Sequence, residues 1–184
     1  YIASEGASQS SRGVLEILNL GSSFTHTGGL LSIGFSSGNP AGDVYLEPET
    51  YNIGTGATLS VEAAAAGQNI SVRSNIPLNN LTIKGTNAPA VTLNTHELIL
   101  NGNFTLESGA TFTSNDLNQT FMGDFTNAGT FQPESSVSYF SGNTQVVEGD
   151  GTTFYDLFIQ PDNSVTLAAG TNLLVNRDLV IKFG

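Results

Sequence analysis

The side chains that could do chemistry are few and widely spaced in this sequence. Its two histidines, His26 and His96, have neither a cysteine nor a second histidine at the spacing of a metal site. A histidine without such a partner is more often found in a turn or at an outward strand position, and we expect this of both. The sequence therefore predicts no catalytic residue, no cofactor-binding residue and no metal ligand at either histidine.

The acidic residues form one dense group, Asp43, Glu47 and Glu49. Carboxylate oxygens are the ligands that calcium prefers, but the spacing matches no calcium-binding loop, and Pro48 interrupts the group. We favour a solvated acidic edge here, and calcium binding is the alternative.

A second pair of acids, Asp150 and Asp156, lies near a repeat boundary described below. Enzymes that cleave polysaccharides need clustered carboxylates, or a basic group beside a carboxylate. The 16 acids of this chain are spread almost evenly, and its five basic residues stand apart from one another. We therefore expect no enzyme. Removal of any one carboxylate at Asp43, Glu47, Asp150 or Asp156 should leave the activity of the parent protein nearly unchanged.

Composition narrows the partners further. Only 11% of the 184 residues are charged and the net charge is −11, so we expect no binding to nucleic acid or to an anionic membrane surface. No apolar run approaches the length of a membrane-spanning helix, which predicts no membrane insertion within this chain.

The absence of cysteine rules out a disulfide framework. A surface of Ser, Thr, Asn and Gln is typical of extracellular β proteins. The chain begins at Tyr1 without an initiator Met or signal peptide, so we expect a segment of a longer exported protein.

An internal repeat organises the sequence. Four short apolar-x-apolar triplets occur twice in the same order, once in the segment 76–106 and again in the segment 152–181. Each triplet suits a very short strand whose first and third side chains face inward, and turn-forming residues separate the triplets. The triplets are Leu81-Thr82-Ile83, Val91-Thr92-Leu93, Leu98-Ile99-Leu100 and Phe104-Thr105-Leu106, then Leu157-Phe158-Ile159, Val165-Thr166-Leu167, Leu173-Leu174-Val175 and Leu179-Val180-Ile181.

A shorter repeat indicates how these strands stack. The segment 102–112 matches the segment 123–131, so Phe104 recurs as Phe125 and Phe112 recurs as Phe131. Like residues stack on like in a parallel β-helix, where each strand lies beside its equivalent one coil away. We therefore predict an all-β fold, a parallel β-helix or β-solenoid of short strands with about 20–25 residues per coil. A β-sandwich, or tandem sandwiches, is the alternative.

We predict a single β-solenoid domain over residues 1–184, since no composition break marks a second one. Residues 1–12 are polar and small, and form a lead-in or cap. Residues 62–67, Glu-Ala-Ala-Ala-Ala-Gly, contain good helix formers followed by a Gly stop, but the run is too short for a stable isolated helix. A small helical cap and a loop of small residues both remain open for this segment.

Three segments carry a resemblance to a known group of proteins: Gly123-Asp-Phe-Thr-Asn-Ala-Gly-Thr-Phe131, Phe140-Ser-Gly-Asn-Thr-Gln-Val-Val-Glu-Gly149 and Phe154-Tyr-Asp-Leu-Phe-Ile159. They resemble repeat units of very large secreted surface proteins of Bacteroidetes-type bacteria, which are exported by the type IX route and described as adhesins or gliding-associated repeats. Asp156 stands where that pattern usually has Asn. The resemblance covers roughly residues 76–184 and fits residues 1–75 only loosely.

Together these features predict a non-enzymatic structural stalk or adhesin module of a secreted, bacterial cell-surface protein. Its partners would be surface glycans or other cell-surface proteins. The alternative is a carbohydrate-binding or carbohydrate-cleaving β-helix protein, which a groove of outward aromatic residues would favour. Tyr45, Tyr139 and Tyr155 are the candidates for such a groove.

Overall fold

The structure is a computed structural model that describes residues 13–37, 42–160 and 163–182. No helix occurs among these residues, and every strand pairing between them is parallel. The strands are β1 (Leu15–Ile33), β2 (Val44–Val61), β3 (Asn69–Ser74), β4 (Asn80–Ile83), β5 (Ala90–Leu93), β6 (Leu98–Leu100), β7 (Phe104–Leu106), β8 (Thr111–Thr113), β9 (Gln119–Phe121), β10 (Phe125–Asn127), β11 (Thr130–Gln132), β12 (Val137–Phe140), β13 (Thr144–Glu148), β14 (Thr152–Phe154), β15 (Asp156–Ile159), β16 (Ser164–Leu167), β17 (Leu173–Val175) and β18 (Leu179–Ile181).

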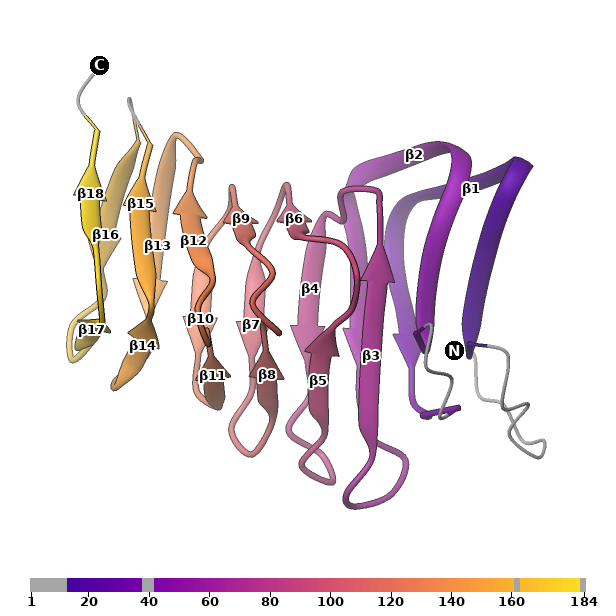
Figure 1. Cartoon of the computed structure of the whole chain (residues 1–184), viewed down its shortest axis with the longest axis horizontal. Helices are drawn as coiled ribbons and strands as arrows, with labels where there is room; N and C mark the ends of the chain where they lie inside the picture. The colour runs from indigo at the N-terminus through magenta and orange to yellow at the C-terminus, as the bar shows by residue number, and fades with distance from the viewer. Residues whose placement is uncertain (1–12, 38–41, 161–162, 183–184) are drawn as a thin grey trace.

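The strands form a β-solenoid with three faces. The first face contains β3, β5, β8 and β11, and it continues with β14 and β17, which pair with each other beside β11. The second face contains β4, β7, β10, β13 and β16. The third face contains β6, β9, β12, β15 and β18. The chain visits the second, first and third faces in turn and then begins the next coil. Figure 1 shows the coils side by side along the long axis, with β1 and β18 at opposite ends of the row.

The coils differ in length along the solenoid. From β3 onward they are short, as the register partners Phe112 and Phe131, or Leu81 and Phe104, illustrate. The first coils are longer, since Leu15 pairs with Val44, and Val44 pairs in turn with Val72. In this part of the chain β1 and β2 are single long strands that bend around the molecule and pair with each other.

One long strand also joins two faces. Val44–Leu46 of β2 pairs with β3 on the first face, whereas Thr58–Val61 of the same strand pairs with β4 on the second face. The two faces therefore belong to one continuous sheet.

The core is a narrow column of apolar side chains. Leu81 and Ile83 are fully buried whereas Thr82 between them is partly exposed, as the alternation predicts. Phe104 and Phe125 are both fully buried, lie in register on neighbouring strands, and stack with ring centroids 5.1 Å apart. Phe112 and Phe131 repeat this arrangement on the first face, with ring centroids 5.4 Å apart. The predicted solenoid and its register are confirmed.

Side chains at the corners link one coil to the next. Asn80 Oδ1 accepts a hydrogen bond of 2.9 Å from the backbone N–H of Asn103, and Asn103 Oδ1 accepts one of 2.9 Å from Asp124. Asp124 Oδ1 continues this corner ladder to the N–H of Val146, at 2.8 Å. Gly102 must lack a side chain, since a Cβ would lie 2.3 Å from Asn80 Oδ1. The ladder satisfies backbone donors where the strand pairing is interrupted.

Polar side chains also occur inside the solenoid. Gln145 is fully buried; its Nε2 donates to the carbonyl oxygens of Phe121 and Gly123, and its Oε1 accepts from the N–H of Gly142. A Cβ on Gly142 would lie 2.0 Å from the carbonyl oxygen of Met122. The Gly-x-x-Gln spacing of this segment therefore closes a corner, because a buried amide must find partners for both of its ends.

The longer repeat has a different structural meaning from the shorter one. Leu81 lies on β4 of the second face, but its match Leu157 lies on β15 of the third face. Each of the four triplets in the first copy matches a triplet that lies eleven strands later in chain order. From β4 onward the chain returns to the same face every three strands, and eleven is not a multiple of three. The repeat therefore identifies the strands correctly but relates different faces, since all faces use the same apolar-x-apolar pattern.

The segment 62–67 is a loop and not a helix. Ala63 is buried, and the N–H groups of Ala64 and Ala65 donate to Oε1 of Gln68, at 2.7 and 3.1 Å. Such side-chain hydrogen bonds give a short polar backbone segment an alternative to helix formation. The predicted lead-in, residues 1–12, lies outside the described residues.

Replacement of Phe104 or Phe125 by Ala should lower the free energy of unfolding by about 3–5 kcal/mol, because each ring leaves a cavity in the column. Thr105→Ala, on the outward side of the same strand, is the matched control and should stay within about 0.5 kcal/mol of the parent. Urea unfolding followed by circular dichroism measures both, and the native spectrum should show β structure with little helix. Equal effects of the inward and outward changes would contradict the register.

Candidate functional site

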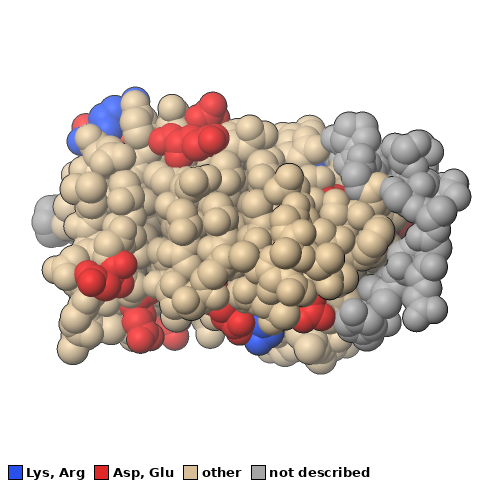
Figure 2. Space-filling view, turned by 90° about the horizontal axis from the view of Figure 1, so that it is seen from below, with Lys and Arg blue, Asp and Glu red and all other residues tan. Residues whose placement is uncertain are grey.

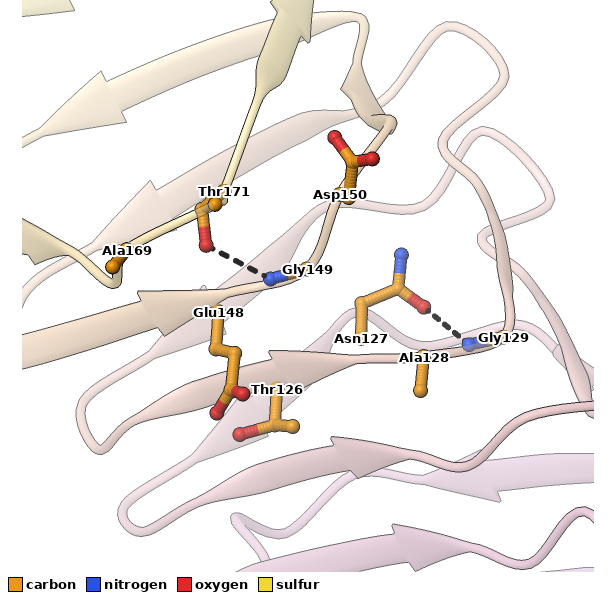
Figure 3. A pocket seen from close by; sticks show the side chains of 10 residues that line it. Thr126, Asn127, Ala128, Gly129, Glu148, Gly149, Asp150, Ala169 and Thr171 are labelled. Carbon is orange, nitrogen blue, oxygen red and sulfur yellow. Dashed lines mark hydrogen bonds between the residues drawn. The ribbon is translucent and has the colours of Figure 1, made fainter.

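A groove lies where the second and first faces meet, over three successive coils. Its volume is about 400 Å³, and it is lined by Thr126, Asn127, Ala128, Gly129, Glu148, Gly149, Asp150, Ala169, Gly170 and Thr171. Thr126 on β10 and Glu148 on β13 are register partners. Figure 3 shows their side chains next to each other, whereas Asp150 points away from them.

Hydrogen bonds stabilise the walls of this groove. Asn127 Oδ1 accepts from the N–H of Gly129 at 3.0 Å, and Asn127 Nδ2 donates to Thr152 Oγ1 at 2.9 Å. The N–H of Gly149 donates to Thr171 Oγ1 at 3.2 Å (Figure 3). Gly149 has a φ of +148°, and a Cβ there would lie 2.5 Å from the carbonyl oxygen of Asn127. Hydrogen bonds thus position the hydroxyl, amide and backbone groups that line the groove.

The chemistry available in this groove is hydrogen bonding by hydroxyl, amide, backbone and carboxylate groups. Asp150 Oδ1 accepts a hydrogen bond of 2.7 Å from Asn172 Nδ2, so one of the two carboxylates of the groove has a structural partner. No group of three or more His, Cys, Asp or Glu side chains that could hold a metal ion occurs among the described residues. Thr126 and Glu148 offer the outward donor and acceptor positions.

The acidic group Asp43, Glu47 and Glu49 does not converge on one point. Asp43 is 2% exposed, and one of its oxygens accepts from the N–H and hydroxyl of Ser37, at 2.6 and 2.7 Å. Its other oxygen accepts from the N–H of Ser71 at 2.9 Å. Glu49 accepts from the N–H of Gly21 instead. The three carboxylates hydrogen-bond to different segments of the protein, and the burial of Asp43 contradicts the predicted solvated edge at that residue.

Glu47 is the centre of a network across three coils, which we name the Glu47 network (Tyr45, Glu47, Arg73 and His96). Glu47 Oε1 lies 2.8 Å from Arg73 Nε and 2.5 Å from His96 Nε2. The guanidinium of Arg73 also lies over the ring of Tyr45, 4.3 Å from its centroid. Burial raises the pKa of Glu47, but the hydrogen bonds from His96 and Arg73 outweigh burial and hold the pKa below its ordinary value.

The partner of His96 is a contact that sequence reasoning missed. His96 lies in the turn region between β5 and β6, as expected, but it reaches a carboxylate that comes much earlier in the chain. Tyr45 and Arg73 are register partners on β2 and β3. No local signal marks this network, because Glu47, Arg73 and His96 come from separate coils. His26 lies within β1, and its Nε2 is 3.1 Å from the carbonyl oxygen of Gly29 in the same strand.

Asp156 has a structural role at a corner of the third face. It is 1% exposed, and its Oδ1 accepts from the N–H of Asp178 at 3.1 Å and from Arg177 Nε at 2.8 Å. Arg177 Nη2 contacts its other oxygen, and this hydrogen bonding to Asp156 is the main reason that the pKa of Arg177 is raised. Asn118 Oδ1 bonds the N–H of Val137 in the same way two coils earlier, so Asp156 does what an Asn would do here.

Three of the basic residues have acidic partners in neighbouring coils, although each stands apart in the sequence. Arg73 pairs with Glu47 and Arg177 pairs with Asp156, as described above. Lys84 Nζ lies 2.6 Å from Glu107 Oε1, and the hydrogen bond from Lys84 is the main cause that lowers the pKa of Glu107. Figure 2 shows how little of one face the charged residues occupy, since uncharged residues cover most of it.

The three tyrosines do not form a common groove. Tyr45 lies under Arg73 on β2, and Tyr155 lies under Arg177, 4.8 Å from its guanidinium carbon. Tyr139 lies on β12 of the third face, where its register partner is Phe158 of β15. Those two rings are half-buried on the outer surface, with centroids 5.5 Å apart. One outward aromatic pair is therefore present, and it includes Phe158.

Comparison with known protein families, with curated sequences and with solved structures found no match. In the described part of the chain, no helix is long and apolar enough to span a membrane.

Glu47 should make stability depend on pH. The pKa of Glu47 is lower in the folded state than its ordinary value of 4.5. Its contribution to the free energy of unfolding is therefore fully present above pH 4.5, and it is lost as the pH falls through the lower folded pKa. Between about pH 6 and pH 3, the urea midpoint should therefore fall further for the parent than for Glu47→Gln. Glu148→Gln, at an exposed carboxylate, is the control, and a Glu47→Gln curve that parallels the parent would contradict the network's role.

Asp43 and Asp150 should respond differently to removal of the carboxylate. Asp43→Ala should lower the free energy of unfolding by at least about 2 kcal/mol, because it removes a buried carboxylate that accepts hydrogen bonds from Ser37 and Ser71. Asp150→Ala, at an exposed position, should cost less than about 1 kcal/mol. Urea unfolding compares the two variants. If Asp43→Ala lowers the free energy of unfolding no more than Asp150→Ala does, the buried hydrogen bonds of Asp43 contribute little to stability.

Proposed function

We propose that this chain is a non-enzymatic, rigid stalk or adhesin module of a secreted or cell-surface protein. The observation that carries the proposal is the unbroken run of in-register parallel pairing from β4 through β7, β10 and β13 to β16 on one face. Each coil is bonded along the axis to the coil before it and the coil after it. Bending the axis would stretch these hydrogen bonds on one side, so the stack resists bending.

Three further sets of contacts support the same function. The phenylalanine column continues through neighbouring coils, from Phe104 to Phe125 and on to Phe154. The corner ladder from Asn80 to Val146 joins the same coils from the side. Ion pairs such as Lys84–Glu107 add a third link. A stack held in this way needs no disulfide, which suits a chain without cysteine.

The resemblance to bacterial surface repeats supports the cellular setting that we propose. Its residues have identifiable structural functions here: Phe125 and Phe131 fill the column, Asn127 and Gly129 make the turn, and Gln145 closes a corner. We infer export to the cell surface by the type IX route, with surface glycans or neighbouring surface proteins as partners. This cellular assignment depends on the resemblance, and localisation of the parent protein tests it.

Duplication of one coil tests the mechanical function. Residues 104–124 make one full step of the second face, since Phe104 and Phe125 are register partners. Three in-register duplications should fold and lengthen the rod by roughly 14 Å, at about 4.8 Å per coil. Small-angle scattering measures the length of the rod. Adhesion by the parent protein should then change with that length.

An out-of-register insertion provides the control. An insertion of about half a coil should unfold the neighbouring coils, because it places outward residues in the column. If surface adhesion is indifferent to three added coils that fold correctly, the stalk mechanism is wrong. If the in-register duplication unfolds the protein, the coils do not act as repeating units.

Carbohydrate binding is the second candidate, and the outward pair Tyr139 and Phe158 favours it. Aromatic faces are the usual apolar platforms for ligands with both apolar and hydroxylated sides, and this pair lies on neighbouring strands of one sheet. Tyr139→Ala and Phe158→Ala should each weaken glycan binding by at least about tenfold. Tyr51→Ala, at a half-exposed tyrosine of β2, is the control. An array on which the parent binds no glycan would end this candidate.

A further inference from the structure

One row of outward side chains runs along the third face. On each strand of this face one residue points outward between two inward-facing neighbours, because successive side chains alternate. Register places these outward residues beside one another in the order Ile99, Thr120, Tyr139, Phe158 and Val180. Ile99 is 40% exposed and the other four are half-buried. We name this row the third-face stripe, and Figure 1 shows its five strands side by side along the solenoid.

The third-face stripe is long and narrow. Its five coils make four steps of about 4.8 Å, or roughly 19 Å, whereas the stripe is only one side chain wide. A stable contact between two proteins takes about 800 Å² from each partner, which is far more than a strip of this width offers. The occupant that fits such a strip is a thin, extended chain.

The pairing of the third face excludes a peptide strand as that chain. β9, β12 and β15 are each paired on both sides, so their backbone N–H and C=O groups bond within the sheet. An added peptide strand binds at the free edge of a sheet, and not across the outer side of strands that are already paired. Side chains alone must therefore hold the occupant of the stripe.

The stripe is uncharged, although the chain that carries it is acidic. Of the residues in the five described strands of this face, only Asp156 is charged, and it is buried and paired with Arg177. The chain as a whole has a net charge of −11, so it repels an acidic polymer and also a second copy of itself. A neutral chain approaches the stripe without this repulsion.

A small polar hollow lies at the β6 end of the stripe. Its volume is about 170 Å³, and Ile99 lines it together with Asn75, His96 and Glu97. Sites that enclose a whole drug-sized ligand have volumes of about 300–1,000 Å³, so this hollow suits one end of a longer chain. The amide, imidazole and carboxylate groups of the hollow can exchange hydrogen bonds with hydroxyl groups. The hollow and the stripe together therefore match a ligand that has hydroxyl groups as well as apolar faces.

We propose that the third-face stripe and this hollow bind one neutral, linear polysaccharide, which lies along the solenoid axis with one end at the hollow. The apolar C–H faces of its sugar rings contact Phe158, Tyr139 and Ile99, and its hydroxyl groups bond to water and to the polar side chains of the hollow. A branched glycan fits less well, because a branch lifts neighbouring rings from a row that is one side chain wide. This inference rests on the carbohydrate binding proposed above, and it adds the class of glycan and the direction in which the glycan lies.

Isothermal titration of the whole chain with neutral β-1,4-linked oligosaccharides of glucose, mannose and xylose tests the proposal. For at least one of these sugars, the hexasaccharide should bind at least about tenfold more tightly than the disaccharide, because it covers more of the stripe. Polygalacturonate, a linear but acidic chain, should bind more weakly than that hexasaccharide, because the protein repels it.

Ile99→Ala tests the part of the stripe that lies beyond the aromatic pair. It should weaken binding of the hexasaccharide by at least about fivefold, because it removes apolar contact area next to the hollow. Val146→Ala is the matched control, since Val146 is also 40% exposed but lies on β13 of the second face, and it should leave the affinity unchanged. Both changes are at outward positions, so circular dichroism of each variant should match that of the parent.

The outcomes separate this inference from the functions proposed above. If Tyr139→Ala weakens binding and Ile99→Ala does not, or if hexasaccharide and disaccharide bind equally, the aromatic pair binds glycan by itself and the extended site is wrong. Tighter binding of polygalacturonate would overturn the neutral class. If the parent binds none of the neutral oligosaccharides, this inference and the carbohydrate-binding candidate both fail, whereas the stalk function is unaffected. A dimer in sedimentation that Ile99→Ala disrupts would show instead that the stripe binds a second copy.

Discussion

Parallel pairing of each strand with its equivalent one coil away is the constraint on which the rest of this structure depends. Because the partner of a residue is the residue at the same place in the next coil, like side chains must stack on like. Phe104 over Phe125, and Phe112 over Phe131, follow directly from this rule. The narrow column leaves little room for a side chain out of step, so inward strand positions are mostly apolar on all three faces.

The same constraint determines what the polar residues do. A solenoid must turn three corners in every coil, and each corner interrupts the strand pairing and leaves backbone groups that need partners. Asn80, Asn103 and Asp124 meet this need on one corner, and Asn118 and Asp156 meet it on another. Side chains that resemble catalytic or metal-binding groups in the sequence thus serve as cross-coil links. Asp43 and Asp156 are the clearest examples, since both are buried.

The outer faces and the inside of the solenoid have different roles. The sides present hydroxyl and amide groups, one aromatic pair and a polar groove, on a backbone whose hydrogen bonds are satisfied by neighbouring coils. The inside of the solenoid instead holds the stack together through its apolar column and the pairing between coils. A ligand that binds the sides therefore leaves the stack unchanged.

The sequence by itself determined the repeated triplets as short strands, the inward residues of these triplets and the shorter coil repeat, because alternation and spacing are local properties of the chain. It could not assign triplets to faces: Leu81 and Leu157 match in sequence but lie on different faces, since all faces share one pattern. It also could not show that Glu47 pairs with Arg73 and His96. The coils differ in length, so the residues that lie beside each other in neighbouring coils cannot be found by counting along the chain. Gln145 shares the inward side of β13 with Val147, but only the closed corner gives its amide partners inside the protein. Tertiary structure decided these positions, because they depend on how many residues each turn consumes.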